Sequence, residues 1–96
     1  MAWAYILECA DGSYYVGSTI DLERRISEHN QGLGAAYTRR RRPVRLAWAG
    51  QFGRIDEAFA FEKRVQGWSR RKREALIAGD LELLRTLASR RRRSGG

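Results

Sequence analysis

Two stretches of apolar, aromatic and β-branched residues open the chain. They run over residues 3–9 and 14–19, and the turn-forming pair Asp11-Gly12 lies between them. Val, Ile, Thr, Tyr and Trp favour strands, and an Asp-Gly pair between two such stretches is a strong local sign of a β-hairpin. The first 19 residues therefore predict two antiparallel strands.

The apolar spacing changes from strand-like to helical at residue 21. Asp21 is of the type that caps a helix N-terminus, and Gly32 is of the type that ends one. Leu22 and Ile26 lie four residues apart and form the inward-facing stripe. These positions predict a helix from Asp21 to about Gln31.

A third strand and a second helix are expected after a loop. Residues 32–42 contain two glycines and a basic run, and Pro43 opens a strand at about 44–52. Asp56 is expected to cap a helix over about 57–68. Apolar residues recur in it at helical spacing and form its buried stripe: Ala58, Phe61, Val65 and Trp68.

The last third of the chain is predicted to be helical. Ser69 is expected to cap a third helix that ends at Gly79, and residues 80–88 form a short closing helix. The order β-β-α-β-α-α, with this further helix, favours an α+β fold: a small, mostly antiparallel three-stranded sheet flanked by helices in a sandwich-like arrangement. Residues 1–88 form one domain, and the arginine- and glycine-rich segment 89–96 is expected to be a disordered basic tail.

The charge of the chain indicates a polyanionic partner. The net charge is +8 and the pI is about 10.8. A solvated surface that keeps the protein in solution is the simpler alternative, but clustered cations favour nucleic acid. The cations cluster in three runs of four: Arg39 to Arg42, Arg70 to Arg73, and Arg90 to Arg93.

Several classes of site and location are disfavoured by composition. Cys9 is the only cysteine and His29 the only histidine, so neither an internal disulfide nor a tetrahedral zinc site can form. A Cys-His nucleophile is also disfavoured, because the spacing of the two residues gives no support to such a pair. No apolar run approaches 18 residues, and the N-terminus does not have the pattern of a secretory signal. We expect a cytoplasmic protein that does not enter the membrane.

Five polar residues in the first two thirds of the chain have the chemistry that metal-assisted phosphodiester cleavage needs: Tyr5, Tyr15, Arg25, His29 and Glu62. An arginine supplies paired donors to phosphate oxygens, and a carboxylate can hold a divalent metal that acts as a Lewis acid. Arg25 and His29 lie four residues apart, so they share a helix face. A tyrosine with the usual pKa of about 10 is a poor base, and it would need nearby cations to ionise.

The length of the hairpin loop decides whether Tyr5 and Tyr15 share a face. A two-residue loop places them on opposite faces of the sheet. A three-residue loop over 11–13 pairs Cys9 with Tyr15 and brings both tyrosines onto one face. We therefore predict an odd-numbered loop, or a bulge near it, because a site that uses both tyrosines requires it.

An ordered set of short motifs resembles the GIY-YIG nuclease superfamily, and above all its small single-domain bacterial members. The set covers about residues 3–88 and is specific only as a whole. It consists of Tyr5, Tyr15-Val16-Gly17, Arg25-Ile26-Ser27-Glu28-His29, Cys9-Ala10-Asp11-Gly12-Ser13, Gly34-Ala35-Ala36-Tyr37-Thr38, Arg42-Pro43-Val44, and Glu57-Ala58 leading to Phe61-Glu62-Lys63.

The resemblance implies a β-β-α-β-α core and a divalent metal, usually Mg²⁺ with Mn²⁺ as the alternative, held mainly by Glu62. It implies that Tyr5 is the general base or relays the proton of a water. Tyr15 would orient that water or contact the phosphate, and Arg25 would stabilise the phosphate. His29 matches a position that assists the tyrosine or the phosphate.

The chain departs from the family pattern in two places. The first triplet is Trp3-Ala4-Tyr5, so only its tyrosine is retained. Several branches of the family also carry an asparagine late in the domain, whereas the only asparagine here is Asn30.

Each of these residues also has a structural interpretation. Tyr5 and Tyr15 suit strands by packing alone. Arg25 could be a surface residue beside an Arg24–Glu28 pair, and His29 could be a surface residue at a helix C-terminus. Glu62 could pair with a cation on its own helix. Trp68 could stack on bases, although its place in the apolar stripe favours the core.

We predict a metal-dependent endonuclease that hydrolyses DNA, with RNA as an alternative substrate, by structure rather than by sequence. Larger members of the family obtain their targeting from an attached domain or a protein partner. The alternatives are a non-catalytic nucleic-acid-binding module and an accessory subunit of a DNA repair complex. Further residues are expected along the substrate path: Thr19, Tyr37, Arg39, Arg40, Arg41, Arg42, Arg70, Arg71 and Lys72.

Overall fold

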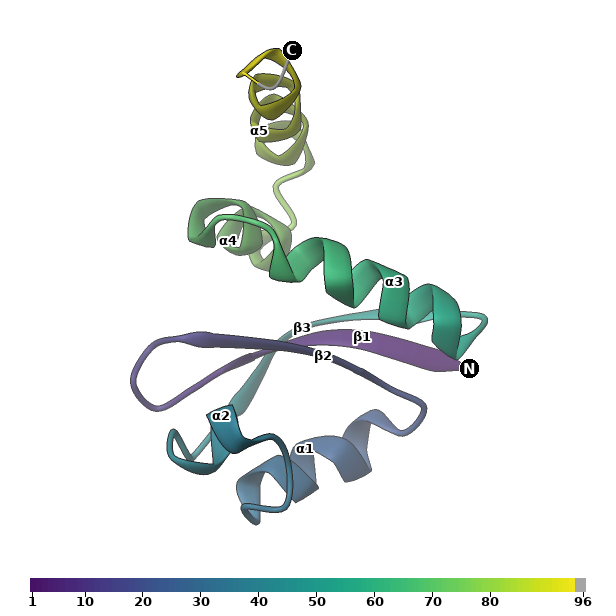
Figure 1. Cartoon of the computed structure of the whole chain (residues 1–96), viewed down its shortest axis with the longest axis vertical. Helices are drawn as coiled ribbons and strands as arrows, with labels where there is room; N and C mark the ends of the chain where they lie inside the picture. The colour runs from purple at the N-terminus through teal and green to yellow at the C-terminus, as the bar shows by residue number, and fades with distance from the viewer. Residues whose placement is uncertain (95–96) are drawn as a thin grey trace. The chain divides into compact units, whose positions relative to one another are not determined.

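The computed structural model describes the backbone of residues 1–94 and the side chains of residues 1–88. The chain forms two compact units, Met1–Gln66 and Gly67–Gly96, which are described separately. The first unit contains a three-stranded sheet and three helices, and the second contains two helices (Figure 1). The predicted order β-β-α-β-α-α and the α+β class are confirmed, and a short helix not expected from the sequence is added.

The sheet is antiparallel, with the strand order β2-β1-β3. The first strand is therefore central, which buries Tyr5, Ile6 and Leu7 to 1% exposure or less. A bulge interrupts the pairing of the first and third strands, since Ile6 faces Trp48 and Leu7 faces Leu46. The strands are β1 (Ala2–Glu8), β2 (Tyr14–Thr19) and β3 (Arg45–Phe52).

The β1–β2 loop has an odd number of residues, as predicted, but its register differs from the expected one. Leu7 faces Tyr15, whereas the sequence suggested Cys9 in that position. Cys9 instead pairs with Ser13 through an N–H···O bond of 2.8 Å, so the loop is 10–12. Gly12 has φ of +83°, which a three-residue loop favours in its last position. Tyr5 and Tyr15 consequently lie on one face of the sheet.

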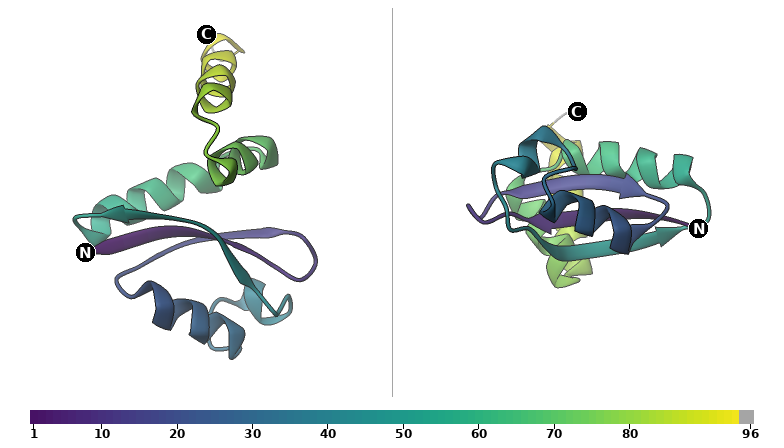
Figure 2. Two further views of the ribbon diagram at one scale, coloured as in Figure 1. Left: turned by 180° about the vertical axis from the view of Figure 1, so that it is seen from behind. Right: turned by 90° about the horizontal axis from the view of Figure 1, so that it is seen from below.

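One face of the sheet carries the two tyrosines and is covered by two helices, α1 (Leu22–Asn30) and α2 (Ala36–Arg39). Figures 1 and 2 show both helices on the same side of the sheet. Asp21 caps α1 by accepting a hydrogen bond from the Arg24 N–H. The helix packs onto the sheet through Leu22 and Ile26, as its apolar spacing predicted. Helix α2 corrects the expectation that residues 32–42 are a loop, since a helix of four residues has no apolar periodicity by which to detect it.

Helix α3 (Ile55–Gln66) covers the opposite face of the sheet (Figure 2). Its Phe61 ring lies 5.7 Å from the Trp48 ring and 5.4 Å from the Phe52 ring, which ties the helix to β3. The helix begins at Ile55, so Asp56 lies in its first turn and is not its cap, contrary to our expectation.

The second unit consists of α4 (Arg70–Ala78) and α5 (Leu81–Ser94). Ser69 caps α4, and Gly79 ends it with φ of +72°, both as predicted. Helix α5 continues in its backbone to Ser94, beyond the expected end at about residue 88. The side chains of the segment 89–96 lie outside the described part of the structure, so its disorder stays a prediction.

Trp68 follows the end of α3 and therefore does not belong to the stripe in which the sequence placed it. Within the described residues, no helix combines the length and the apolarity needed to cross a membrane.

Candidate active site

Tyr5 is the centre of a polar cluster on the α1 face of the sheet. Its ring crosses the backbone of Gly17 on β2, where a Cβ atom would lie 2.5 Å from the Tyr5 hydroxyl. No side chain fits in that space, which explains the glycine of the Tyr15-Val16-Gly17 motif. The Tyr5 hydroxyl lies 3.0 Å from Nε2 of His29 and also forms a hydrogen bond with Arg25.

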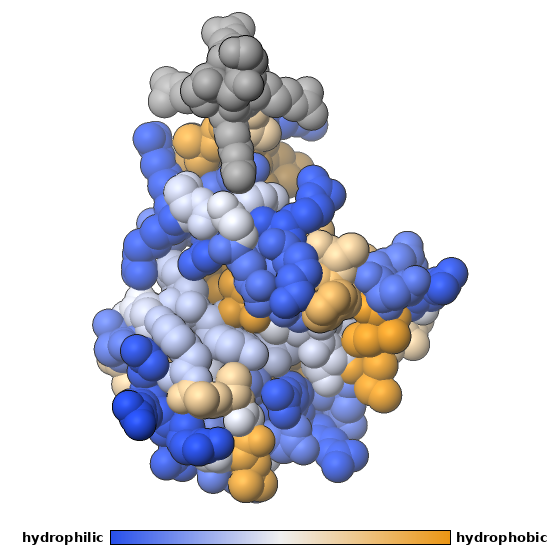
Figure 3. Space-filling model, in the orientation of Figure 1, coloured by the Kyte–Doolittle hydropathy of each residue, from blue (hydrophilic) through white to orange (hydrophobic). Residues whose placement is uncertain are grey.

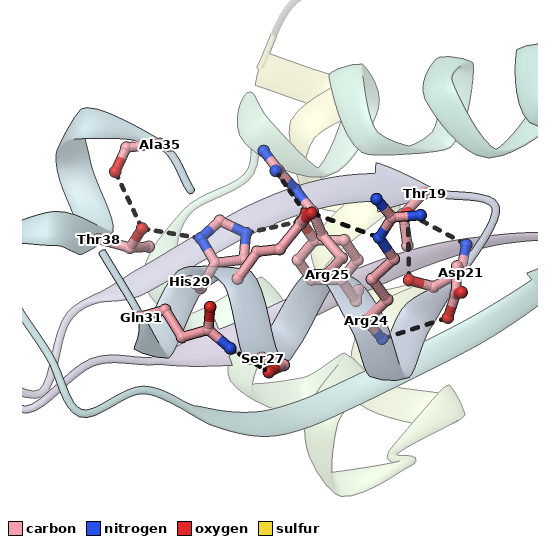
Figure 4. Close-up of polar contacts among 11 residues, drawn as sticks. Thr19, Asp21, Arg24, Arg25, Ser27, His29, Gln31, Ala35 and Thr38 are labelled. Carbon is pink, nitrogen blue, oxygen red and sulfur yellow. Dashed lines mark hydrogen bonds and ion pairs between the residues drawn. The ribbon is translucent and has the colours of Figure 1, made fainter. Parts of the chain in front are cut away.

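His29 lies in the last turn of α1 and is fully buried, so the alternative of a surface histidine is excluded. Its Nδ1 lies 2.8 Å from Oγ1 of Thr38. Figure 4 shows one ring nitrogen facing Thr38 and the other pointing toward the Arg25 side of the helix. The Tyr15 ring lies 5.1 Å from the imidazole. Burial, and then the charge of Arg25, lower the pKa of His29, which keeps the ring neutral at neutral pH.

Burial is also the main cause of the pKa shifts of the two tyrosines. It raises the pKa of Tyr5 to about 12, and the hydrogen bond from Arg25 opposes this shift without cancelling it. Burial, followed by the charge of Glu62, raises the pKa of Tyr15. Arg25 is a nearby cation of the kind that Tyr5 would need in order to ionise. Burial nevertheless has the larger effect on the pKa of Tyr5.

Arg25 has a carboxylate partner that the sequence interpretation did not assign to it. Its Nη1 lies 3.1 Å from Oε1 of Glu28, and the expected Arg24–Glu28 pair is also present at 3.5 Å. Arg25 thus shares Glu28 with Arg24. The Arg25 side chain remains one third exposed.

Glu62 lies on the other side of the sheet, on α3, in a separate hydrogen-bond network at the β2 edge. Its Oε1 accepts a hydrogen bond from Oγ of Ser18 at 2.6 Å, and its Oε2 accepts one from Nε2 of Gln66 at 2.7 Å. Lys63 on the same helix lies 3.8 Å away, so the expected ion pair within the helix is also present. Burial is the main reason that the pKa values of Tyr5 and Tyr15 are raised, and the negative charge of Glu62 adds to the shift, least for Tyr5.

The described residues contain no group of three or more His, Cys, Asp or Glu side chains suited to hold a metal. Glu62 would therefore be a single protein ligand. Mg²⁺ is commonly held by one or two carboxylates together with substrate phosphates and water, and this donor set fits that mode. The hydrogen bonds from Ser18 and Gln66 leave further lone pairs on the carboxylate for such an ion.

Comparison with known proteins connects this geometry with a family. The chain matches the GIY-YIG catalytic domain over residues 1–75. It belongs to the GIY-YIG family. This is a family of nucleases, and the match covers all five predicted catalytic residues.

Small proteins of the same family are similar to this chain over most of their length. A UPF0213 protein of Halobacterium salinarum is 47% identical over 80% of this chain and 100% of its own length. A UPF0213 protein of Halalkalibacterium halodurans is 49% identical over 79% and 81%, respectively. The solution NMR structure of a UPF0213 protein from Bacillus halodurans has a TM-score of 0.53, with 48% identity over 81% of this chain and 84% of that chain.

The four arginines at positions 39–42 of this GIY-YIG domain differ in whether they are hydrogen-bonded within the loop. Arg41 donates to Asp11 at 3.0 Å and to the Tyr37 carbonyl at 2.9 Å, and Arg42 donates to the Arg39 and Asn30 carbonyls. These two arginines therefore hold the loop together. The side chains of Arg39, Arg40 and Arg42 are exposed, and of these three Arg42 is engaged with the loop carbonyls.

The other residues predicted along the substrate path lie in three places. Tyr37 is 39% exposed, stacks on Tyr15 at 6.2 Å and carries the Arg41 guanidinium 3.9 Å above its ring. The Thr19 hydroxyl accepts a hydrogen bond from the Asp21 N–H at 3.2 Å, so it orders the entry to α1. The α4 residues belong to the second unit: Arg70, Arg71 and Lys72.

One face of the molecule shows mainly hydrophilic surface, with apolar patches that are separate from one another (Figure 3). Such a surface is typical of a protein whose exposed apolar residues are scattered.

Four residues that hold the site were not found by sequence reasoning. Thr38 contacts His29, and Gly34 lies so close to the ring that a Cβ atom there would be 2.3 Å from Nδ1. Ser18 and Gln66 hold Glu62. Thr38 and Gly34 belong to the motif 34–38 on which the family resemblance rested, and this was the one available signal.

Proposed function

We propose that this protein is a metal-dependent endonuclease that hydrolyses phosphodiester bonds in DNA. The observation that supports it most is the Tyr5 hydroxyl, buried between a neutral histidine and an arginine, within the field of the Glu62 carboxylate. A strand-centre tyrosine chosen only for packing would not need two polar partners of different chemistry.

Tyr5 is the general base of the proposed reaction, with His29 as the group that makes this possible. A phenol with a pKa of about 12 does not ionise by itself at neutral pH. It can take a proton from water if it gives its own proton to His29 in the same step, and the 3.0 Å contact allows this transfer. The hydroxide then attacks phosphorus, and the leaving oxygen takes up a proton from solvent.

Arg25 holds the phosphate on which this hydroxide acts. Its guanidinium is one third exposed and offers paired donors that match two phosphate oxygens. Phosphate binding competes with Glu28, so part of the Arg25–Glu28 pair is exchanged when substrate binds. Tyr15, beside His29, orients the attacking water or contacts the phosphate.

Glu62 would hold the divalent metal, most simply Mg²⁺, through the lone pairs that Ser18 and Gln66 leave open. When bound, the ion supplies Lewis-acid stabilisation to the phosphate and to the leaving oxygen. Glu62 itself needs only to be held in the right orientation for this purpose.

DNA is held through its phosphates, which gives affinity without selecting a sequence. Arg39 and Arg40 are the exposed cations nearest in sequence to the Tyr37 ring, and the net charge of +8 supports the same partner. We therefore expect a preference for branched, flapped or nicked structures. RNA and a targeting protein partner remain part of the proposal as alternatives to be tested.

Binding by these cations is checked through its salt dependence. We expect Arg39→Gln with Arg40→Gln to weaken binding to duplex DNA and to reduce the slope of log K against log salt by about 0.9 for each phosphate that the variant no longer neutralises. Arg54→Gln removes another exposed arginine of the same unit and serves as the control. Equal slopes for the double variant and the wild type would contradict a role of this pair.

The function is tested by cleavage of labelled single-stranded, duplex, flapped and branched DNA and of RNA, with Mg²⁺ or Mn²⁺ and with chelator. We expect metal-dependent products that are lost in Glu62→Ala and in Arg25→Ala. Glu62→Ala should still bind the preferred DNA, because the proposed binding rests on the cations that contact phosphates and not on the carboxylate. Products that are unaffected by Glu62→Ala would show a contaminating nuclease and would contradict the proposal.

A non-catalytic nucleic-acid-binding module is the second candidate, and the high pKa of Tyr5 favours it. It predicts tight, salt-sensitive binding in the same experiment with no products above the level of the Glu62→Ala variant. An accessory subunit of a repair complex would instead show weak binding of the isolated chain.

A further inference from the structure

Thr38 is a fully buried polar residue that the catalytic proposal does not use. It lies on α2, nine residues after His29, and its hydroxyl is in contact with two groups at once. One is the Ala35 carbonyl oxygen at 3.0 Å, and the other is Nδ1 of His29 at 2.8 Å (Figure 4).

The single hydrogen of the Thr38 hydroxyl can go to only one of these groups. A carbonyl oxygen has no hydrogen to give, so the Ala35 contact exists only if Thr38 is the donor. The Thr38 oxygen must then accept in its contact with His29, and His29 Nδ1 must carry a hydrogen.

A neutral imidazole carries one N–H, so a hydrogen on Nδ1 leaves Nε2 as an acceptor. Tyr5 must consequently donate in its 3.0 Å contact with Nε2. The four groups then form one directed series, from the Tyr5 hydroxyl through His29 and Thr38 to the Ala35 carbonyl.

We propose that Thr38 is a positioning residue that fixes His29 in the tautomer able to accept the Tyr5 proton. The proposal rests on the nuclease function proposed above, because the direction of the Tyr5–His29 bond matters only if Tyr5 must lose a proton. In the opposite tautomer, Nε2–H would donate to the Tyr5 oxygen, and the histidine could accept nothing from it.

The imidazole also has little freedom to turn away from Thr38. The Gly34 backbone approaches so closely that a Cβ atom there would lie 2.3 Å from Nδ1, and the Tyr15 ring lies 5.1 Å from the imidazole. When Tyr5 transfers its proton, the O–H bond breaks and an Nε2–H bond forms. His29 then carries two N–H groups, and Thr38 continues to accept from Nδ1. Thr38 therefore stabilises the histidine before and after transfer.

The tautomer can be measured directly, because His29 is the only histidine in the chain. The full chain is labelled with ¹⁵N-histidine, and the ring nitrogens are assigned from their coupling to the two carbon-bound ring protons, near pH 7.5 and without DNA or metal. For the wild type we expect a protonated Nδ1 and an unprotonated Nε2. Thr38→Ser keeps the hydroxyl and should keep this tautomer, whereas Thr38→Val should shift it toward Nε2–H.

Single-turnover cleavage of the preferred DNA provides the second readout. Since general base catalysis typically contributes 10²–10⁴-fold, we expect Thr38→Val to lose about 100-fold or more in rate with little change in DNA affinity. Thr38→Ser should stay within several-fold of the wild type.

A wild-type spectrum with the proton on Nε2 would overturn the proposal without any variant, and so would an unchanged tautomer in folded Thr38→Val. The expected tautomers in a chain that cleaves no substrate would support the assignment of Thr38 and contradict the nuclease function instead. The two proposals can therefore fail separately.

Discussion

Acid should destabilise this protein through one residue, His29, well above the pH at which carboxylates are protonated. The imidazole is fully buried, and burial together with Arg25 lowers its pKa below the ordinary value of 6.5. Glu28 opposes the shift but does not cancel it. As the pH falls through 6.5, the unfolded chain takes up a proton that the folded chain does not, so stability decreases.

The size of the effect is bounded. Between pH 7.5 and 5.5, a group with an unfolded pKa of about 6.5 that stays neutral in the folded state lowers the free energy of unfolding by about 1.4 kcal/mol. Any protonation of folded His29 within this range makes the loss smaller. Because His29 is the only histidine and Asp and Glu titrate mainly below this range, no other side chain should contribute as much.

The assay is denaturant unfolding at pH 7.5, 6.5 and 5.5 at fixed ionic strength, for the wild type and His29→Gln. We expect the wild type to lose stability toward pH 5.5 and the variant, though less stable throughout, to lose almost none. A wild type as stable at pH 5.5 as at 7.5 would show that folded His29 accepts a proton at its ordinary pKa. The same loss in both proteins would assign it to another group.

Two further substitutions test the packing of the site and the metal ligand. Gly34→Ala would place a Cβ atom 2.3 Å from Nδ1 of His29, and we expect the free energy of unfolding measured in urea to fall by about 1–3 kcal/mol. Gly53→Ala is the control: a Cβ atom there would lie 3.7 Å from its nearest neighbour, so the stability should hardly change. Ser18→Ala removes the 2.6 Å hydrogen bond to Glu62, and we expect the affinity for Mn²⁺, measured by calorimetry, to fall about 10–100-fold. Unchanged Mn²⁺ binding would show that the carboxylate needs no support from Ser18.

The sequence was sufficient to predict the elements that are long enough to show a pattern of apolar residues. The strands, the α1 stripe and the caps at Asp21 and Ser69 were all found. The shared face of Tyr5 and Tyr15 was also predicted, because it depends only on whether the loop length is odd or even. The actual register depends on Gly12 and on the hydrogen bonds of the turn, which a count of residues does not reveal.

The contacts around His29 could not be predicted in the same way. Thr38 reaches the ring through α2, a helix too short to leave a pattern in the sequence. The arginines from 39 to 42 look equivalent as letters, yet Arg41 and Arg42 are bound within the loop. Such differences depend on the distances between residues far apart in the sequence, which only the fold determines.

The most direct test of the proposed mechanism is single-turnover cleavage by Tyr5→Phe, which removes the one hydroxyl shared by His29 and Arg25 and keeps the ring over Gly17. We expect the cleavage rate to fall by about 100-fold or more while DNA binding and folding stay close to those of the wild type. A Tyr5→Phe variant that cleaves at the wild-type rate would contradict the assignment of Tyr5 as the base.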